Sequence, residues 1–176
     1  LARISCLMSD LPKALGQINE SLTTNAVNNS AINLKASIQR NLGDTDGAGK
    51  TLAEITGKDP LDFRACNEDY LLAKKSGNLK QSDELLADLK RKMRDFDQNY
   101  LDLAVGYMND GFLPEAEDVL TRYKGNNQEV KYYLGYIQHN KGNKSEAEKF
   151  FSEASGMPVD YGFPFRMESL KIFGLA

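Results

Sequence analysis

Eight residues of this chain come close to a phosphate-binding loop. Residues 44–51 read DTDGAGKT. The loop they approach cradles phosphates with the backbone N–H groups of a glycine-rich turn, followed by a lysine and a threonine. That motif begins with glycine, where this chain has Asp44, whose carboxylate would repel phosphate. It also follows a buried strand, whereas the apolar residues of 31–42 recur at helical spacing. We therefore expect no nucleotide site here.

The side chains that usually carry catalysis are few. His139 is the only histidine, and a nucleophilic triad needs a base of this kind beside the nucleophile. We interpret His139 as a surface or groove residue. Acidic residues such as Asp69, Glu115 and Glu117 fall on expected helix faces, where the pattern implies no apolar pocket for a general acid. The sequence thus predicts no catalytic residue and no enzyme.

Two cysteines and one histidine do not supply a structural zinc site, which usually takes four Cys or His ligands. We predict neither a metal nor another cofactor. Cys6 and Cys66 fall in helices two repeats apart, which is too far for a disulfide between neighbouring Cα atoms. We expect both to be small packing residues.

Composition excludes two classes of partner. The chain has 176 residues, 41% of them hydrophobic and 27% charged, with a net charge of -3. Such a small charge gives no electrostatic footprint for nucleic acid or an anionic membrane. No apolar run reaches the roughly 20 residues that span a bilayer. The length fits one globular domain, and we predict a protein or peptide partner, with no nucleic acid and no membrane.

A repeat of about 34 residues organises the chain. The glycines Gly43, Gly77, Gly111 and Gly142 follow one another after 34, 34 and 31 residues. Each lies in a polar turn between two segments with helical apolar spacing, and we expect it to adopt the left-handed conformation that ends a helix. Small residues keep the same step, at Ala14, Ala48, Ser82, Ala116 and Ala147. Asn78 and Asn143 are expected to cap the second helix of their repeats. We expect Ala147 to face Gly135 on the first helix.

This pattern resembles the tetratricopeptide repeat (TPR) family. The last repeat carries the resemblance best, through Leu134, Gly135, Gly142, Ala147, Phe151, Ala154 and Pro158. The resemblance implies an all-α fold, a right-handed α-α superhelix or TPR-like solenoid of about five helical hairpins plus a C-terminal capping helix. We expect one domain over residues 1–176. Its repeats are 1–28 (truncated), 29–62, 63–96, 97–127 and 128–159, and its C-terminal cap is 160–176.

Two short stretches carry a narrower resemblance. Residues 58–63 and 160–168 look like the helical-repeat region of large Bacteroidetes proteins that also contain a glycosidase-like domain of unknown function. This resemblance implies a second hypothesis, in which the chain is an accessory or oligomerisation region of a larger carbohydrate-active protein. Its partner would then be a sugar-processing domain of the same chain.

The TPR resemblance also implies where a partner binds. In that family the first helices of successive repeats line a concave groove. Carried onto this chain, the groove positions predict a polar and basic half and an apolar, aromatic half. The candidate residues are Asn33, Arg40, Arg64, Asn67, Lys74, Leu101, Met108, Tyr132, Tyr136 and His139. We expect the basic residues to be solvated, and packing between repeats stays an alternative for the apolar ones. The leading hypothesis is a non-catalytic protein–protein interaction scaffold that holds a peptide or partner domain.

Overall fold

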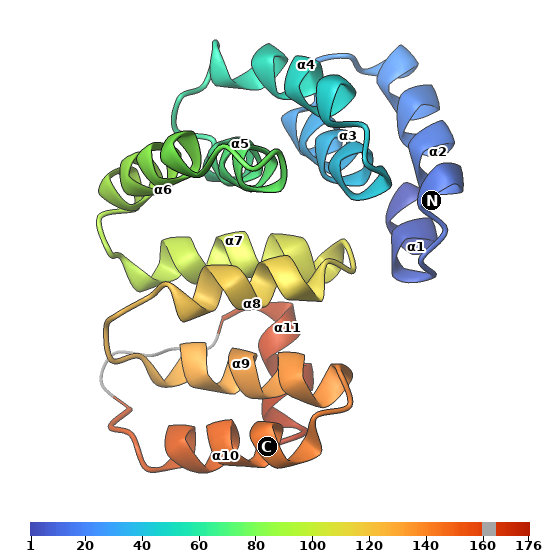
Figure 1. Cartoon of the computed structure of the whole chain (residues 1–176). Helices are drawn as coiled ribbons and strands as arrows, with labels where there is room; N and C mark the ends of the chain where they lie inside the picture. The colour runs from blue at the N-terminus through green and yellow to red at the C-terminus, as the bar shows by residue number, and fades with distance from the viewer. Residues whose placement is uncertain (160–164) are drawn as a thin grey trace. The chain divides into compact units, whose positions relative to one another are not determined.

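The computed structural model describes residues 1–159 and 165–176. Its chain divides into two compact units, Leu1–Arg94 and Asp95–Ala176, which we call the N-terminal and C-terminal units and describe separately. The described residues form helices and turns only (Figure 1). The predicted all-α class, built from helical hairpins, is therefore confirmed. None of the described helices is long and apolar enough to cross a membrane.

The N-terminal unit consists of three helical hairpins. Their helices are α1 (Ala2–Leu7), α2 (Leu11–Thr24), α3 (Asn29–Leu42), α4 (Thr45–Thr56), α5 (Phe63–Lys75) and α6 (Leu79–Met93). The C-terminal unit has two hairpins and one further helix. These are α7 (Asp97–Asn109), α8 (Leu113–Thr121), α9 (Gln128–Asn140), α10 (Lys144–Ser155) and α11 (Met167–Phe173). The first helices of the five hairpins are α1, α3, α5, α7 and α9.

The turn glycines have the conformation that their spacing predicts. Gly43, Gly77, Gly111 and Gly142 all have positive φ, between 75° and 89°. After each glycine, the next backbone N–H donates to the carbonyl five residues earlier, as from Asn143 to Gln138 at 2.9 Å. This bond satisfies a carbonyl that the end of the first helix would otherwise leave unpaired.

The first hairpin makes the same turn without a glycine. Ser9 stands 34 residues before Gly43 and has a φ of 61°. Asp10 then donates its N–H to the Ser5 carbonyl at 2.9 Å, which is the bond the other turns make. A side chain in the left-handed region carries a steric cost, so a search for glycine does not find this turn.

The near-match to a phosphate loop is a helix cap. Asp44 precedes α4 and its Oδ1 accepts the N–H of Gly47 at 2.9 Å. A Cβ on Gly47 would lie 2.0 Å from Asp44 Oδ2, so the capping carboxylate needs glycine at this position. The segment before it is helix α3, as expected. The helix N-terminus that a phosphate would use is thus filled by the protein's own carboxylate.

Of the two expected asparagine caps, one is made. Asn78 accepts the N–H of Gln81 at the start of α6. Asn143 stands at the start of α10 but makes no such bond, and that prediction is wrong. Its side-chain amide donates instead to Gln138 Oε1 at 2.8 Å, a partner on the preceding helix α9.

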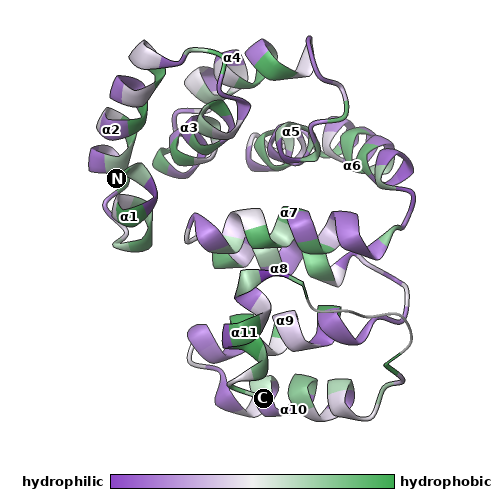
Figure 2. Ribbon diagram, turned by 180° about the vertical axis from the view of Figure 1, so that it is seen from behind, coloured by the Kyte–Doolittle hydropathy of each residue, from purple (hydrophilic) through white to green (hydrophobic). Residues whose placement is uncertain are grey.

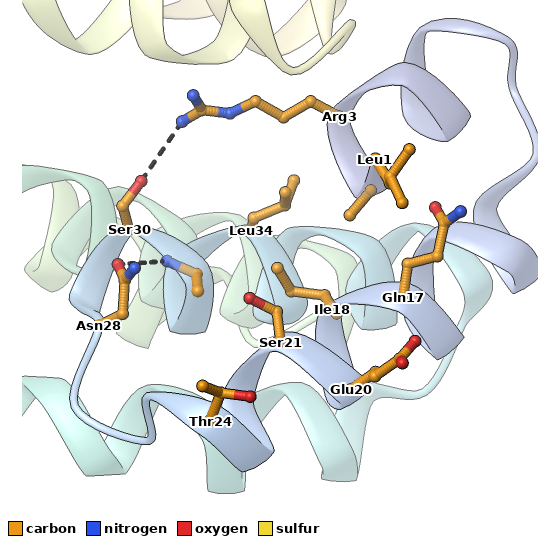
Figure 3. Close-up of a pocket in the computed structure, with 12 residues that line it drawn as sticks. Leu1, Arg3, Gln17, Ile18, Glu20, Ser21, Thr24, Asn28, Ser30 and Leu34 are labelled. Atoms are coloured by element: carbon orange, nitrogen blue, oxygen red, sulfur yellow. Dashed lines mark hydrogen bonds between the residues drawn. The ribbon is translucent and has the colours of Figure 1, made fainter.

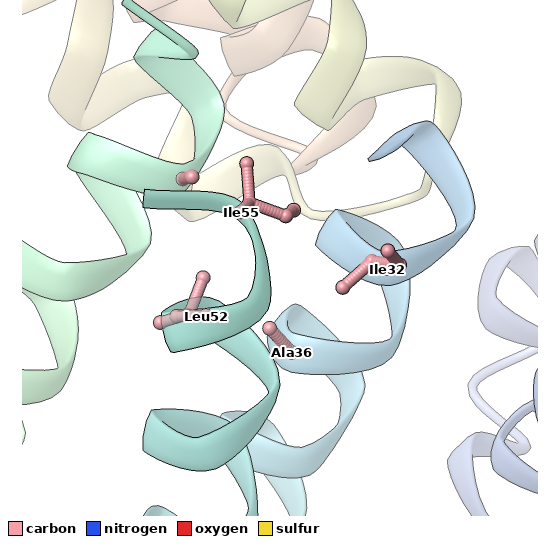
Figure 4. Close-up of a cluster of buried hydrophobic side chains, with 5 residues drawn as sticks. Ile32, Ala36, Leu52 and Ile55 are labelled. Carbon is pink, nitrogen blue, oxygen red and sulfur yellow. The ribbon is translucent and has the colours of Figure 1, made fainter. Parts of the chain in front are cut away.

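Small residues let the helices of each hairpin approach closely. In the N-terminal unit, Ile32 and Ala36 of α3 pack with Leu52 and Ile55 of α4 and with Ala65 of α5, and all five are buried (Figure 4). In the C-terminal unit, a Cβ on Gly135 would lie 2.5 Å from the ring of Phe151. The expected neighbour of Gly135 was Ala147, but the Phe151 ring is nearer, because the aromatic side chain reaches back from α10 across α9.

Candidate partner-binding surfaces

A buried ion pair joins α3 to α5. Arg40 Nε lies 2.7 Å from Glu68 Oε2, and the two side chains are 8% and 0% exposed. Ser37 donates its hydroxyl to Glu68 Oε1 at 2.7 Å and accepts from Arg64 Nη2 at 2.9 Å. Arg64 Nε also lies 3.6 Å from the same carboxylate. Two arginines and a serine from two first helices therefore converge on one buried glutamate.

The expectation that the basic residues are solvated is wrong for Arg40. Its side chain is buried because α3 packs against α5 and because Glu68 offsets the cost of removing a guanidinium from water. Arg64 is half-buried in the same place. Both arginines organise the α3/α5 contact, and this contact fixes the local backbone.

The predicted amide residues of the N-terminal unit are also built into this contact. Asn33 donates through Nδ2 to both carboxylate oxygens of Asp62, at 3.1 and 3.0 Å. Asp62 is also the N-cap of α5, where it accepts the N–H of Ala65 at 3.0 Å. Asn67 is completely buried. These side chains position α5 relative to α3.

Exposed positive charge collects at the C-terminal end of α5. Lys74 and Lys75 are both exposed, and so is Asn41 near the end of α3. Lys74 donates to the Tyr70 hydroxyl at 3.2 Å and lies over its ring. Lys75 donates to the backbone carbonyl of Arg40. The two lysines thus stand beside the buried ion pair and remain open to solvent.

One carboxylate in this unit has a perturbed acidity that the sequence did not predict. Burial, followed by the negative charge of Glu68, raises the pKa of Asp69 to about 6, while Lys92 opposes the shift. Asp69 lines a cleft between α4, α5 and α6, near Lys50. The described residues lining that cleft include no histidine or cysteine, so the arrangement defines no reaction.

In the C-terminal unit, α11 lies against the first helices. Figures 1 and 2 show it crossing α9, and the two helices are in contact. Ser169 and Tyr133 share a hydroxyl–hydroxyl bond of 3.0 Å, and Asn109 of α7 donates to Glu168 Oε1 at 2.7 Å. The Phe173 ring meets Tyr132 edge-on, with ring centroids 4.7 Å apart. Residues 160–164, the first part of the predicted cap, lie outside the described residues.

Arg166 anchors this segment between α7 and α9. Its Nε and Nη2 lie 2.9 and 2.6 Å from Asp102 Oδ1, and Nη2 donates to Gln98 Oε1 at 2.6 Å. On the other side, Nη1 stops 3.9 Å from Glu129 Oε2. Burial raises the pKa of Glu129, and the charge of Arg166 opposes that shift.

The aromatic predictions fall partly together. Tyr132 and His139 line one cavity of about 730 Å³ with Phe151 of α10 and with Phe173. His139 is exposed, and Tyr132 and Tyr136 are half-buried. Tyr136 is not among the residues lining this cavity. Leu101 is fully buried and Met108 nearly so, as the packing alternative expects for apolar first-helix residues.

A second cavity lies where none of the ten candidate residues reaches. It has a volume of about 520 Å³ and opens beyond the N-terminal end of α1, over α2 and α3 (Figure 3). Ile18 and Leu34 form its apolar part, and Arg3 bonds Ser30 across its rim at 3.3 Å. The cavity forms because α1 has six residues, whereas α3 has 14. No cluster of potential metal ligands occurs there or elsewhere in the described part of the chain.

Sequence reasoning missed the acidic partners of these surfaces. Glu68, Asp62, Asp102 and Glu129 all lie on or beside first helices and accept from arginine or asparagine. One signal was available, since Glu68 follows Arg64 by four residues and so shares its helix face. The contribution of Arg166 could not be predicted in this way, because it comes from 64 residues beyond Asp102.

No protein-family model matches the sequence, and no match to a curated protein was found. Solved structures do match. A tetratricopeptide repeat protein from Parabacteroides merdae is 20% identical, with a TM-score of 0.54 over 99% of this chain and 67% of that one. Residues 41 to the end of MamA from Desulfovibrio magneticus are 15% identical, with a TM-score of 0.51 over 88% of this chain and 89% of that one.

These likenesses establish a TPR-like fold. At such identities they show the fold alone, so function has to be argued from the surfaces. Neither structure is described as carrying a sugar-processing domain, and the narrower resemblance to Bacteroidetes proteins has no support beyond the two stretches that prompted it. Residues 160–164 of the second stretch lie outside the described residues.

Proposed function

We propose that this chain is a non-catalytic protein-interaction scaffold that binds a peptide or partner domain on the faces of its first helices. The TPR-like fold supports this role, because stacked hairpins present extended surfaces instead of a closed active site. The observation that carries the proposal is the position of α11. On the C-terminal unit, the first-helix face already holds a helical segment through side-chain contacts from both α7 and α9.

The N-terminal unit offers a surface of different chemistry. The Arg40–Glu68 pair fixes α3 against α5, so the exposed Lys74 and Lys75 project from a preorganised backbone. Preorganisation lowers the entropy lost on binding, and exposed lysines steer an oppositely charged partner. We therefore propose that the α3/α5 face takes an acidic segment.

The ten candidate residues divide into two roles under this proposal. Those that are exposed or half-buried would touch the partner, namely Arg64, Lys74, Tyr132, Tyr136 and His139. Those that are buried would position them, namely Asn33, Arg40, Asn67, Leu101 and Met108. We further propose that the five hairpins and the C-terminal cap work as one domain over residues 1–176.

The proposal can be tested by capture of a partner from a lysate of the source cell. The variant Lys74→Glu, Lys75→Glu reverses both exposed charges and leaves the buried pair intact. A change at Arg40 would be a poor choice, because it would leave Glu68 buried without its main partner. We expect the unmodified chain to capture a partner that the double variant loses.

The matched control is Lys80→Glu, Lys90→Glu, which makes the same charge change at exposed positions of α6. It should capture the partner as well as the unmodified chain does. Equal loss in both double variants would show a response to net charge and would count against the α3/α5 face. Retention by both would remove this face from the proposal.

A further inference from the structure

The α7/α9 face is built to receive an arginine. Arg166 comes from outside the hairpins, yet its side chain is only 6% exposed. Its guanidinium meets Gln98 and Asp102 of α7 on one side and approaches Glu129 of α9 on the other. Three acceptor side chains from two helices thus surround one guanidinium, which is the arrangement that distinguishes arginine from lysine.

The repeat gives this site a counterpart in the N-terminal unit. Asp102 stands 34 residues after Glu68, at the equivalent place in the next repeat. Both carboxylates accept an arginine: Glu68 takes Arg40 from the neighbouring first helix, and Asp102 takes Arg166 from the C-terminal segment. One acceptor is therefore satisfied within the hairpins, whereas the other is filled by a segment added after them.

The segment that fills the site is held incompletely. Arg166 Nη1 makes no hydrogen bond, and neither oxygen of the buried Glu129 carboxylate has a hydrogen-bond partner among the described residues. Helix α11 has seven residues, too few for appreciable stability of its own. Its outer side leaves Phe165, Met167 and Leu170 between 70% and 79% exposed, so little apolar burial holds it in place.

The inner side of α11 defines the chemistry that the face accepts. Arg166, Ser169 and Ile172 recur every three residues and are buried, and Phe173 follows against Tyr132. Helix-in-groove recognition uses anchors at this kind of spacing. A competing helix would need an arginine before its first turn, a small hydroxyl residue one turn later and an apolar residue after that.

We propose that the α7/α9 face is an arginine-recognising, helix-binding surface on which residues 165–173 act as a displaceable resident, to be exchanged for a partner helix with the same anchors. This inference rests on the proposed function and adds the partner's chemistry and a built-in competitor. Binding of the partner then requires the release of Arg166 from Asp102 and Gln98.

The test uses the full chain and a fluorescent peptide of residues 165–176. Arg166→Glu places a negative charge against Asp102 and Glu129 and should expel the resident segment. We expect the labelled peptide to bind this variant at least tenfold more tightly than it binds the unmodified chain, as measured by fluorescence anisotropy. A peptide carrying Arg166→Ala should lose at least tenfold in affinity for the same variant.

Lys171→Glu is the matched control, because it makes the same charge change on the exposed side of α11. That chain should bind the peptide as weakly as the unmodified chain. If charge reversal prevents folding, Arg166→Gln keeps the side chain polar but uncharged and should still bind the peptide at least threefold more tightly. Equal affinity for all folded chains, or no binding to any of them, would overturn the proposal.

This assay uses no cellular partner, so its outcome is separate from that of the capture experiment. A peptide that fails to bind would leave the capture result at the α3/α5 face standing. Failed capture alongside peptide binding would leave the arginine site standing without the acidic partner.

Discussion

Arg40 and Glu68 form a buried ion pair with 2.7 Å between Nε and Oε2, although 28 residues separate them in the sequence. The pair joins the first helices of two successive hairpins. A charge removed from water has to be matched by its partner, so the contact specifies how α3 and α5 meet. It turns a predicted ligand-binding arginine into a support for the surface beside it.

Removing the charge of Glu68 should destabilise the N-terminal unit strongly. Glu68→Gln leaves Arg40 buried and Arg64 half-buried without a counter-charge, and such losses cost about 3–5 kcal/mol. Urea unfolding followed by circular dichroism measures the change. Glu84→Gln, at an exposed position of α6, should change stability by less than about 0.5 kcal/mol. Similar small effects of both substitutions would contradict the assigned role of the pair.

Asp69 should make stability depend on pH. Its pKa is about 6 in the folded chain, against an ordinary value of 3.8 for an aspartate, so the folded state holds the proton more tightly than the unfolded state. The free energy of unfolding should therefore fall as pH rises from about 4 to 6. Allowing for partial solvent screening, Asp69→Asn should gain on the order of 1–2 kcal/mol at pH 7 and nothing below pH 4.

Denaturant melts of the parent and Asp69→Asn chains between pH 4 and 8 measure this difference. Asp83→Asn provides the control, since Asp83 is exposed on α6. A gain that stays constant across the pH range would point to helix propensity instead of titration.

Two glycine substitutions should have opposite signs. A Cβ added to Gly16 in α2 would meet no other helix within 4 Å, so Gly16→Ala should stabilise by up to about 1 kcal/mol through helix propensity. At Gly135 the same added Cβ meets the Phe151 ring at 2.5 Å. Overpacking costs about 1–3 kcal/mol, so Gly135→Ala should be destabilising by about 1 kcal/mol net. Thermal melts of both variants decide this, and stabilisation by Gly135→Ala would show that the ring moves aside freely.

Ser9 offers a stabilising substitution. Glycine adopts its φ of 61° without steric cost, and Ser9→Gly should gain about 0.5–1 kcal/mol after the greater entropy loss of glycine is counted. Ser76→Gly is the comparison, because Ser76 has a φ of -76° and donates to the Leu72 carbonyl. That change should be destabilising. If both substitutions change the melting temperature in the same direction, strain at Ser9 is not the cause.

The sequence predicted the hairpins because their turns depend on local chemistry. Each glycine at the 34-residue step has the expected left-handed φ, and the apolar spacing around it is a property of single helices. Ser9 was missed because the same turn forms there at a steric cost. Asn143 was assigned as a cap because the pattern gives its position but not the Gln138 amide that competes for it.

The surfaces were less predictable because they depend on contacts between helices. The position of Arg40 in its repeat indicates the side of α3 on which it lies, but its burial follows from the approach of α5 and from Glu68. Arg166 reaches Asp102 from a segment that lies beyond the last hairpin. Neither contact leaves a periodic signal, since each joins residues at separations unrelated to the repeat.

The central claim is that a partner binds the first-helix face of the N-terminal unit, and site-specific photo-crosslinking tests it most directly. A photoreactive amino acid would replace Lys75 on α5 or Lys80 on α6, two exposed lysines five residues apart on successive helices. The account predicts a crosslink to the captured partner from position 75 and none from position 80. A crosslink from position 80 alone, or equal crosslinking from both positions, would contradict it.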